Sequence, residues 1–206
     1  MKKTAAKLLI ILGIVANIGQ LTAFADFSDL AETHKNYAAI IYLQEHGIIN
    51  GYYDGTFKPN NSVNRAEFLK IILNGSQVAL DINQATPFPD VNHNAWYAPY
   101  LKKAYSQGWI NGYPDGTFKP EQTINKVEAL KVLAKVQNWQ LDNLTNTKPF
   151  NDIALNEWYS PYIAYAKDHQ YLEETSALFF PAMLMTRAKI SEIIYRSLTV
   201  IEIADE

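Results

Sequence analysis

The 206-residue sequence contains no cysteine. Disulfide bonds, thiol catalysis, thiolate-bound zinc and a lipid-modified N-terminal cysteine are therefore excluded. Basic residues are also scarce, since 18 Lys and Arg stand against 21 Asp and Glu. This balance excludes the broad basic surface that binds nucleic acid or an anionic membrane, so any anion must be bound by a local cluster of cations.

Long apolar runs are scarce as well, and the only one of note lies near the N-terminus. Three lysines within the first seven residues precede the apolar run 8–15, and an Ala-Phe-Ala sequence ends at Ala25. This pattern predicts a signal peptide over residues 1–25, cleaved after Ala25. The alternative, an N-terminal membrane anchor, needs an apolar run of roughly 20 residues. Cleavage changes the formal charge from −3 to −6 and leaves an exported chain without a membrane span.

The sequence contains internal repeats. Residues 47–59 (GIINGYYDGTFKP) reappear as residues 108–120 (GWINGYPDGTFKP), and a diverged third copy has YLEETSALFFP at 171–181. The repeats run over 27–87, 88–149 and 150–206, so we expect a single domain over residues 26–206. A hydrophobic content of 48% and an aromatic content of 13% are typical of a folded globular protein.

Each repeat has the pattern of a helix, a loop and a second helix. In the second repeat the first helix is expected to begin near Pro99 and to end at Gly108. The second helices are expected to begin at good N-cap residues, of which two are followed by a Glu that completes a capping box. These caps are Asn64, Asn125 and Thr186. The Asp-Gly pairs at 54–55 and 115–116 predict tight turns, and the whole pattern predicts an all-α fold.

The repeated motif resembles the S-layer homology (SLH) domain family. It reads F-x-D, W-Y, G-x-I-x-G-Y-x-D-G-T-F-K-P and then N/T-R-A-E, over residues 27 to about 200. The first repeat has Lys35 in place of the Trp, and the third lacks the D-G-T-F turn. The resemblance implies a pseudo-threefold domain around a central three-helix bundle. It also implies grooves between neighbouring repeats that bind secondary cell-wall polysaccharide, often carrying pyruvate ketals.

A cation follows every second-helix cap, as Arg65, Lys126 and Arg187. A positive charge in the first turn opposes the helix dipole, so another interaction must favour it. Free N–H groups of the helix terminus and an Arg fork together suit a carboxylate or phosphate group. The alternative is a surface ion pair with a nearby carboxylate. Lys126 lacks the fork geometry.

Two tryptophans and two glycines complete the set of candidate ligand-binding residues. Trp96 and Trp158 precede first helices and either offer a flat face to a sugar ring or cover the core as lids. Gly51 and Gly112 either let a ligand approach the backbone or satisfy a turn. Trp109 is assigned to packing because other repeats have Ile or Tyr at its position, and so are the loop residues Phe57, Phe118 and Phe179.

Catalytic and metal-binding equipment is not visible in the sequence. Each Asp-Gly turn supplies one carboxylate where a calcium loop needs several, and the four His occupy unrelated repeat positions. We therefore expect no cofactor, no metal and no enzymatic activity, and a glycan-processing enzyme with a degenerate site is the weakest hypothesis. The hypothesis is a secreted anchoring module that binds anionic, pyruvylated polysaccharide attached to peptidoglycan at the cell wall or S-layer. The alternative is a structural or adaptor protein whose partners are other surface-layer proteins.

Overall fold

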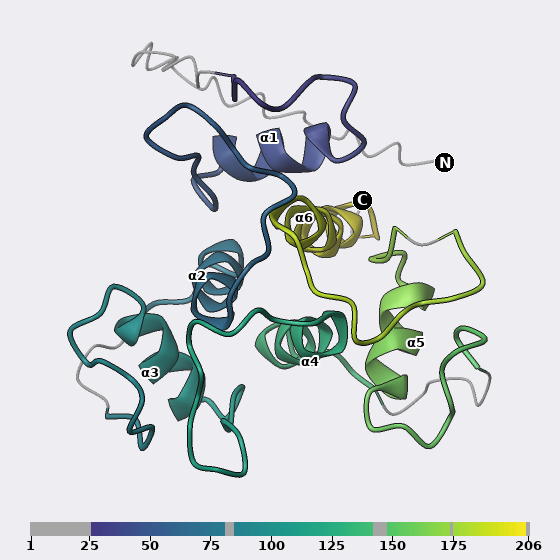
Figure 1. The fold of residues 1–206 in the computed structure, drawn as a ribbon. Coiled ribbons are helices and arrows are strands. Elements are labelled where there is room, and N and C mark those ends of the chain that lie inside the picture. Colours follow the sequence, from purple (N-terminus) through teal and green to yellow (C-terminus); the bar gives the residue numbers. More distant parts are fainter. Residues whose placement is uncertain (1–25, 81–84, 142–147, 174, 205–206) are drawn as a thin grey trace, which may run out of the picture.

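The computed structural model describes residues 26–80, 85–141, 148–173 and 175–204, and within these ranges it has six α-helices and no sheet (Figure 1). The helices are α1 (Tyr37–Glu45), α2 (Arg65–Gly75), α3 (Ala98–Ser106), α4 (Lys126–Val136), α5 (Ser160–Asp168) and α6 (Arg187–Ala204). The prediction of an all-α fold is confirmed. The predicted signal peptide, residues 1–25, lies outside the described residues. In the part of the chain that is described, no helix is long and apolar enough to cross a membrane.

The second helices of the repeats form the centre of the molecule, and the first helices surround them (Figure 1). Each outer helix packs against the second helix of the preceding repeat, so α3 contacts α2 and α5 contacts α4. The first helix of the chain, α1, packs against the last, α6, and this contact closes a ring. The predicted pseudo-threefold arrangement around a central bundle of α2, α4 and α6 is confirmed.

Capping boxes begin the central helices α2 and α4. The Asn64 side chain accepts a hydrogen bond from the amide of Glu67 at 2.8 Å, and the Glu67 carboxylate accepts one from the Asn64 amide at 2.9 Å. The same reciprocal pair recurs at Asn125 and Glu128. In the third repeat, Thr186 accepts a longer bond, of 3.4 Å, from the amide three residues further on. The boxes predicted from the sequence are confirmed.

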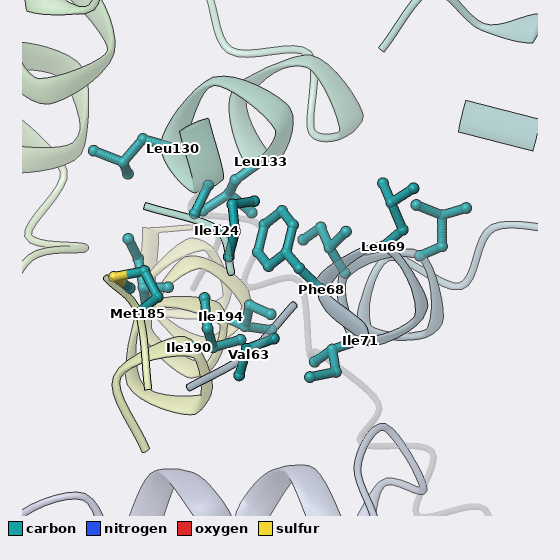
Figure 2. Packing of buried hydrophobic residues seen from close by; sticks show 14 of the residues in the cluster. Val63, Phe68, Leu69, Ile71, Ile124, Leu130, Leu133, Met185, Ile190 and Ile194 are labelled. Atoms are coloured by element: carbon teal, nitrogen blue, oxygen red, sulfur yellow. The ribbon is translucent and has the colours of Figure 1, made fainter. Parts of the chain in front are cut away.

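The repeats are joined at the residue that precedes each cap. Val63 N donates to Met185 O, Ile124 N to Val63 O and Met185 N to Ile124 O, each at 3.0 Å, so three backbone bonds form a closed triangle. The three side chains are buried, and Figure 2 shows them beside Phe68 and Ile194 in the core between the central helices. This triangle fixes the start of every central helix relative to the other two.

The loop between the two helices is held by the Asp near the start of its repeat. Asp29 accepts hydrogen bonds from the amides of Phe57 (2.6 Å) and Lys58 (2.8 Å), and Asp90 and Asp152 do the same in their repeats. The predicted tight turns are confirmed by positive φ angles of 77° at Gly55 and 79° at Gly116. The loop phenylalanines are fully buried, as predicted, and they are Phe57, Phe118 and Phe179.

Candidate ligand-binding grooves

The cation after each cap reaches across to the loop of the next repeat around the ring. It donates a hydrogen bond to the carbonyl oxygen of the buried loop phenylalanine and lies over the ring of that same residue. The three bonds are Arg65 Nε to Phe118 (2.9 Å), Lys126 Nζ to Phe179 (2.7 Å) and Arg187 Nε to Phe57 (2.8 Å). The three ring contacts are at 4.5, 3.9 and 4.5 Å. A bond to a carbonyl group, rather than a surface ion pair, is therefore what the three cations share.

The amide groups at the start of the central helices are already bonded. Arg65 N donates to Gln122 O at 2.9 Å, Ala66 N donates to Pro120 O at 3.0 Å, and Glu67 N donates to the cap side chain. Helices α4 and α6 make the corresponding bonds to the loop of the next repeat. The prediction that these termini offer free N–H groups to an anion is therefore wrong, because the neighbouring loop supplies carbonyl oxygens to them. An anion bound here must be held by side chains.

Among the described residues, two open grooves lie between repeats, and each is lined by residues of all three repeats. The Arg187 groove has a volume of about 220 Å³ and brings together Arg187, Lys70 and Trp96. Its other polar and loop residues are Asn50, Gly51, Tyr52 and Glu67. The Arg65 groove has a volume of about 160 Å³ and brings together Arg65, Lys131 and Trp158. Its other polar and loop residues are Asn111, Gly112, Tyr113, Glu128 and Lys135.

The guanidinium group in each open groove is sandwiched by aromatic rings. Arg187 lies 4.9 Å from the ring of Tyr52 and 4.5 Å from that of Phe57, and its Nη2 donates to Asn50 O at 2.8 Å. Burial lowers the pKa of Arg187, against the opposing effect of Tyr52, Glu67 and Asp29. An arginine remains charged at neutral pH even so. The groove therefore holds a fixed positive charge.

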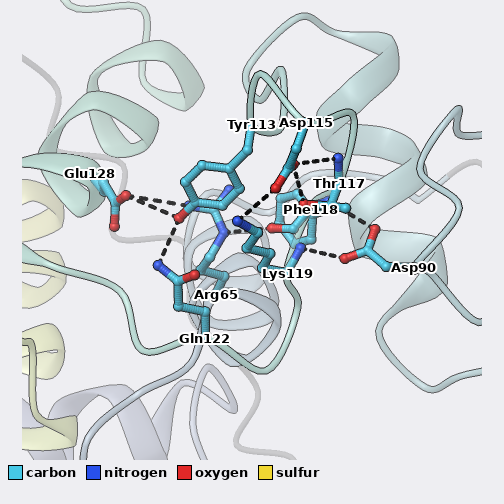
Figure 3. Close-up of polar contacts among 9 residues, drawn as sticks. All are labelled: Arg65, Asp90, Tyr113, Asp115, Thr117, Phe118, Lys119, Gln122 and Glu128. Carbon is cyan, nitrogen blue, oxygen red and sulfur yellow. Dashed lines mark hydrogen bonds and ion pairs between the residues drawn. The ribbon is translucent and has the colours of Figure 1, made fainter.

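Arg65 has the same environment in its groove. It lies 4.8 Å from the ring of Tyr113 and 4.5 Å from that of Phe118, and its Nη1 is 3.9 Å from Glu128 Oε1. The Tyr113 hydroxyl also donates to Glu128 at 3.3 Å and accepts from Gln122 at 3.0 Å, and both contacts can be followed in Figure 3. Burial raises the pKa of Tyr113, so its hydroxyl stays protonated at neutral pH. These contacts hold the Arg65 side chain in one position.

The tryptophans stand at the rims of the grooves. Trp96 is 53% exposed and Trp158 is 51% exposed, so each indole keeps an open surface that a ligand can reach. The ammonium of Lys70 lies 5.7 Å from the Trp96 ring, and that of Lys131 lies 4.8 Å from the Trp158 ring. Sequence reasoning missed these lysines. A repeated signal existed in the sequence, because both lysines occupy the same position of their repeats, five residues after the cations Arg65 and Lys126 that follow the helix caps.

The two candidate glycines are explained by packing. A Cβ atom on Gly51 would lie 2.4 Å from Phe27 Cε1, and one on Gly112 would lie 2.4 Å from the same atom of Phe88. Gly112 also has a positive φ of 71°. Both residues line open grooves, but their lack of a side chain is required by the loop itself.

The third site between repeats has a volume of only about 20 Å³, room for about one water molecule. Its cation, Lys126, is 3% exposed. Three positions of the open grooves hold different residues here. Lys35 replaces the rim tryptophan, Glu192 replaces the lysine (Lys70 or Lys131), and Glu173 replaces the asparagine (Asn50 or Asn111). The missing Trp of the first repeat and the missing turn of the third thus fall in one site, because the ring joins these two repeats.

Polar contacts fill this third site. Lys35 Nζ lies 2.6 Å from Glu173 Oε1. The carboxylate of Glu192 accepts a bond of 3.0 Å from Asn36 Nδ2 and one of 2.6 Å from Arg196 Nε. The side chains at the ligand-site positions are here bonded to other groups of the protein itself. Across the described ranges, no cluster of three or more His, Asp or Glu is placed to hold a metal ion.

The fold and its grooves define a class of protein, an all-α ring of three helix pairs with open inter-repeat sites. Residues 26–69 and 87–130 match the family model of the S-layer homology domain, so these two segments are similar to that domain. These segments cover the start of the first and second repeats as far as α2 and α4.

Curated relatives carry similar sequence within longer chains. Cell surface glycoprotein 1 of Acetivibrio thermocellus is 32% identical over 187 residues, which is 84% of this chain and 8% of that protein. The cellulosome-anchoring protein of the same organism is 29% identical over 153 residues, 72% of this chain and 34% of that protein. An S-layer protein of Bacillus thuringiensis subsp. finitimus is 28% identical over 149 residues, 71% and 18% respectively. The chain thus spans about a third or less of the length of these relatives.

Proposed function

We propose that the protein is a non-catalytic module that attaches to the cell surface by binding an anionic wall polysaccharide in the Arg65 and Arg187 grooves. The observation that carries this proposal is the repeated grouping of a guanidinium, an ammonium and an exposed indole around one cavity. Guanidinium and ammonium groups bind carboxylates, and a tryptophan face packs against a sugar ring. A sugar that carries a pyruvate ketal offers both features.

The proposed roles differ among the candidate residues. Arg65 and Arg187 bind the carboxylate, and Lys70 and Lys131 supply a second positive charge beside it. Lys126 has a structural role, because it is buried and donates to the carbonyl group of the next repeat. Trp96 and Trp158 form the sugar platforms, and Gly51 and Gly112 shape the loops that the ligand touches.

The same proposal covers the organisation of the chain. Residues 1–25 act as a signal peptide, and residues 26–206 form one S-layer homology domain with its third repeat at 150–206. The protein is then exported and retained at the cell wall or S-layer. The relatives support this view, since one is named as an anchoring protein and another as an S-layer protein.

Sedimentation with purified sacculi tests the proposal. Mature protein is expected to co-sediment with intact sacculi and to stay in the supernatant once the polysaccharide has been removed. The Trp96→Ala, Trp158→Ala double variant is expected to lose binding, whereas Tyr53→Ala, a fully exposed aromatic that lines neither groove, serves as the matched control. Binding that survives removal of the polysaccharide would instead indicate a protein partner of the surface layer.

A further inference from the structure

A second hollow adjoins the Arg65 groove. It has a volume of about 320 Å³ and lies where α3 and α4 end beside α5. Its side chains come from the ends of these helices and the residues that follow them, chiefly Gln107, Asn138, Trp139 and Tyr162. Trp109 and Lys135 line both this hollow and the Arg65 groove. The two spaces therefore meet along the wall that these two residues form.

Packing and hydrogen bonds fix this shared wall. Lys135 Nζ donates to Gly108 O at 2.8 Å, and Trp109 is half-buried with its amide bonded to Ala104 O at 3.0 Å. The floor is equally well held. Trp139 is buried, and its ring stacks on that of Tyr165 with centroids 4.7 Å apart and an interplanar angle of 15°. A ligand would therefore meet a preformed surface.

The Arg187 groove is built differently at the corresponding positions. Ile48 stands in place of Trp109, Asn74 in place of Lys135 and Val78 in place of Trp139. The indole and the ammonium that join the two hollows are thus specific to the Arg65 groove. The two open grooves are not equivalent, although both contain the same arginine, lysine and tryptophan.

The lining of the second hollow combines aromatic surface with exposed amide side chains. Trp109 and Tyr162 offer faces to a sugar ring, and Gln107 and Asn138 can both donate to and accept from hydroxyl groups. We propose that this hollow is an extension site, which binds neutral sugar units of the same polysaccharide chain whose anionic unit occupies the Arg65 groove. This inference rests on the proposed function, and it assigns a longer ligand segment to one groove than to the other.

Fragments of wall polysaccharide test the extension site. They are released from the host's sacculi, separated into short fragments of a single repeating unit and longer ones, and titrated by calorimetry into two variants. Trp96→Ala disables the Arg187 groove, and Trp158→Ala disables the Arg65 groove. The Trp96→Ala protein is expected to bind long fragments about tenfold more tightly than short ones, equivalent to about 1.4 kcal/mol. The Trp158→Ala protein is expected to bind long and short fragments with similar affinity. It is the control for the tighter binding that long fragments could show merely because they contain several copies of the repeating unit.

Substitutions within the extension site sharpen the test. In the Trp96→Ala background, Trp109→Ile introduces the residue of the first repeat, and Gln107→Ala removes an exposed amide. Both are expected to reduce the preference for long fragments, and Gln107→Ala is expected to leave short-fragment affinity unchanged. His46→Ala, at the position of Gln107 in the first repeat, is the matched control in the Trp158→Ala background.

The outcomes separate the two proposals. Equal length dependence in the two single-groove variants, or a length preference untouched by Trp109→Ile and Gln107→Ala, would overturn the extension site while leaving the grooves intact. Failure of fragments of any length to bind either variant would contradict the proposed function itself.

Discussion

The ammonium group of Lys35 lies 2.6 Å from the carboxylate of Glu173, and this ion pair joins the first repeat to the third. In the two open grooves the same positions hold a tryptophan and an asparagine. The protein's own charged side chains therefore fill the third site between repeats. The other two sites each keep a cavity beside an arginine whose position is fixed.

The Lys35–Glu173 ion pair makes the stability of the folded protein sensitive to acid pH. Burial alone would raise the pKa of Glu173, but the hydrogen bonds and charge of Lys35 and Asn36 lower it below 4.5. Its stabilisation is thus complete above about pH 4.5 and is lost as the pH falls through the folded-state pKa. We expect Glu173→Gln to lower the free energy of unfolding by about 0.5–1 kcal/mol at pH 7, the scale of a partly exposed pair.

Urea unfolding at pH 7 and pH 3 checks this expectation. The difference between Glu173→Gln and the unmodified protein should shrink at the lower pH, and the exposed Glu32→Gln should show no difference at either. A Glu173→Gln effect of the same size at both pH values would show that the carboxylate charge contributes nothing.

Arg65→Lys separates the structural role of the cation from its binding role. Lys126 makes the same carbonyl bond with an ammonium group, so the variant is expected to keep the bond to the Phe118 carbonyl. Its free energy of unfolding is expected to lie within about 1 kcal/mol of that of the original protein. It loses the guanidinium fork, and in the Trp96→Ala background, where only the Arg65 groove binds, its affinity for wall polysaccharide is expected to fall about tenfold. Arg65→Ala is expected to lose both, with a stability cost of about 1.5–3 kcal/mol. In that background, an Arg65→Lys protein that binds as tightly as Trp96→Ala alone would rule out recognition by the fork.

Gly51→Ala is expected to destabilise the loop of the first repeat. The added methyl group would lie 2.4 Å from Phe27 and 2.9 Å from the carbonyl oxygen of Thr56, an overpacking that costs about 1–3 kcal/mol. Gly47→Ala is the comparison, because a Cβ there meets nothing within 4 Å and only the positive φ of 66° opposes it. Thermal unfolding measures both, and a Gly51→Ala protein more stable than Gly47→Ala would contradict the packing account.

Much of the fold follows from local sequence. The repeat period, the caps at Asn64 and Asn125 and the Asp-Gly turns predict the helices and their number within the described chain, because each depends on residues close together. The pairing of α1 with α6 does not follow in this way. It depends on which apolar faces meet around the ring, and all three outer helices present similar faces.

The candidate site was only partly predictable for a physical reason. The free helix N-termini expected from the sequence are occupied by carbonyl groups of Pro120 and Gln122 and their counterparts, and backbone carbonyls have no residue signature. In the sequence, Lys70 and Lys131 resemble ordinary solvent-exposed residues of an amphipathic helix. In the folded ring, a tryptophan of another repeat lies beside each of them. Such contacts arise from the assembly of the repeats.

Calorimetric titration of released wall polysaccharide tests the central claim most directly. Short fragments are titrated into the mature protein, the two single variants Trp96→Ala and Trp158→Ala, and their double variant, with circular dichroism as the check on folding. We predict two binding sites in the original protein, one in each single variant and none in the double variant. Three sites in the original protein, or undiminished binding by the folded double variant, would contradict the assignment of the ligand to the Arg65 and Arg187 grooves.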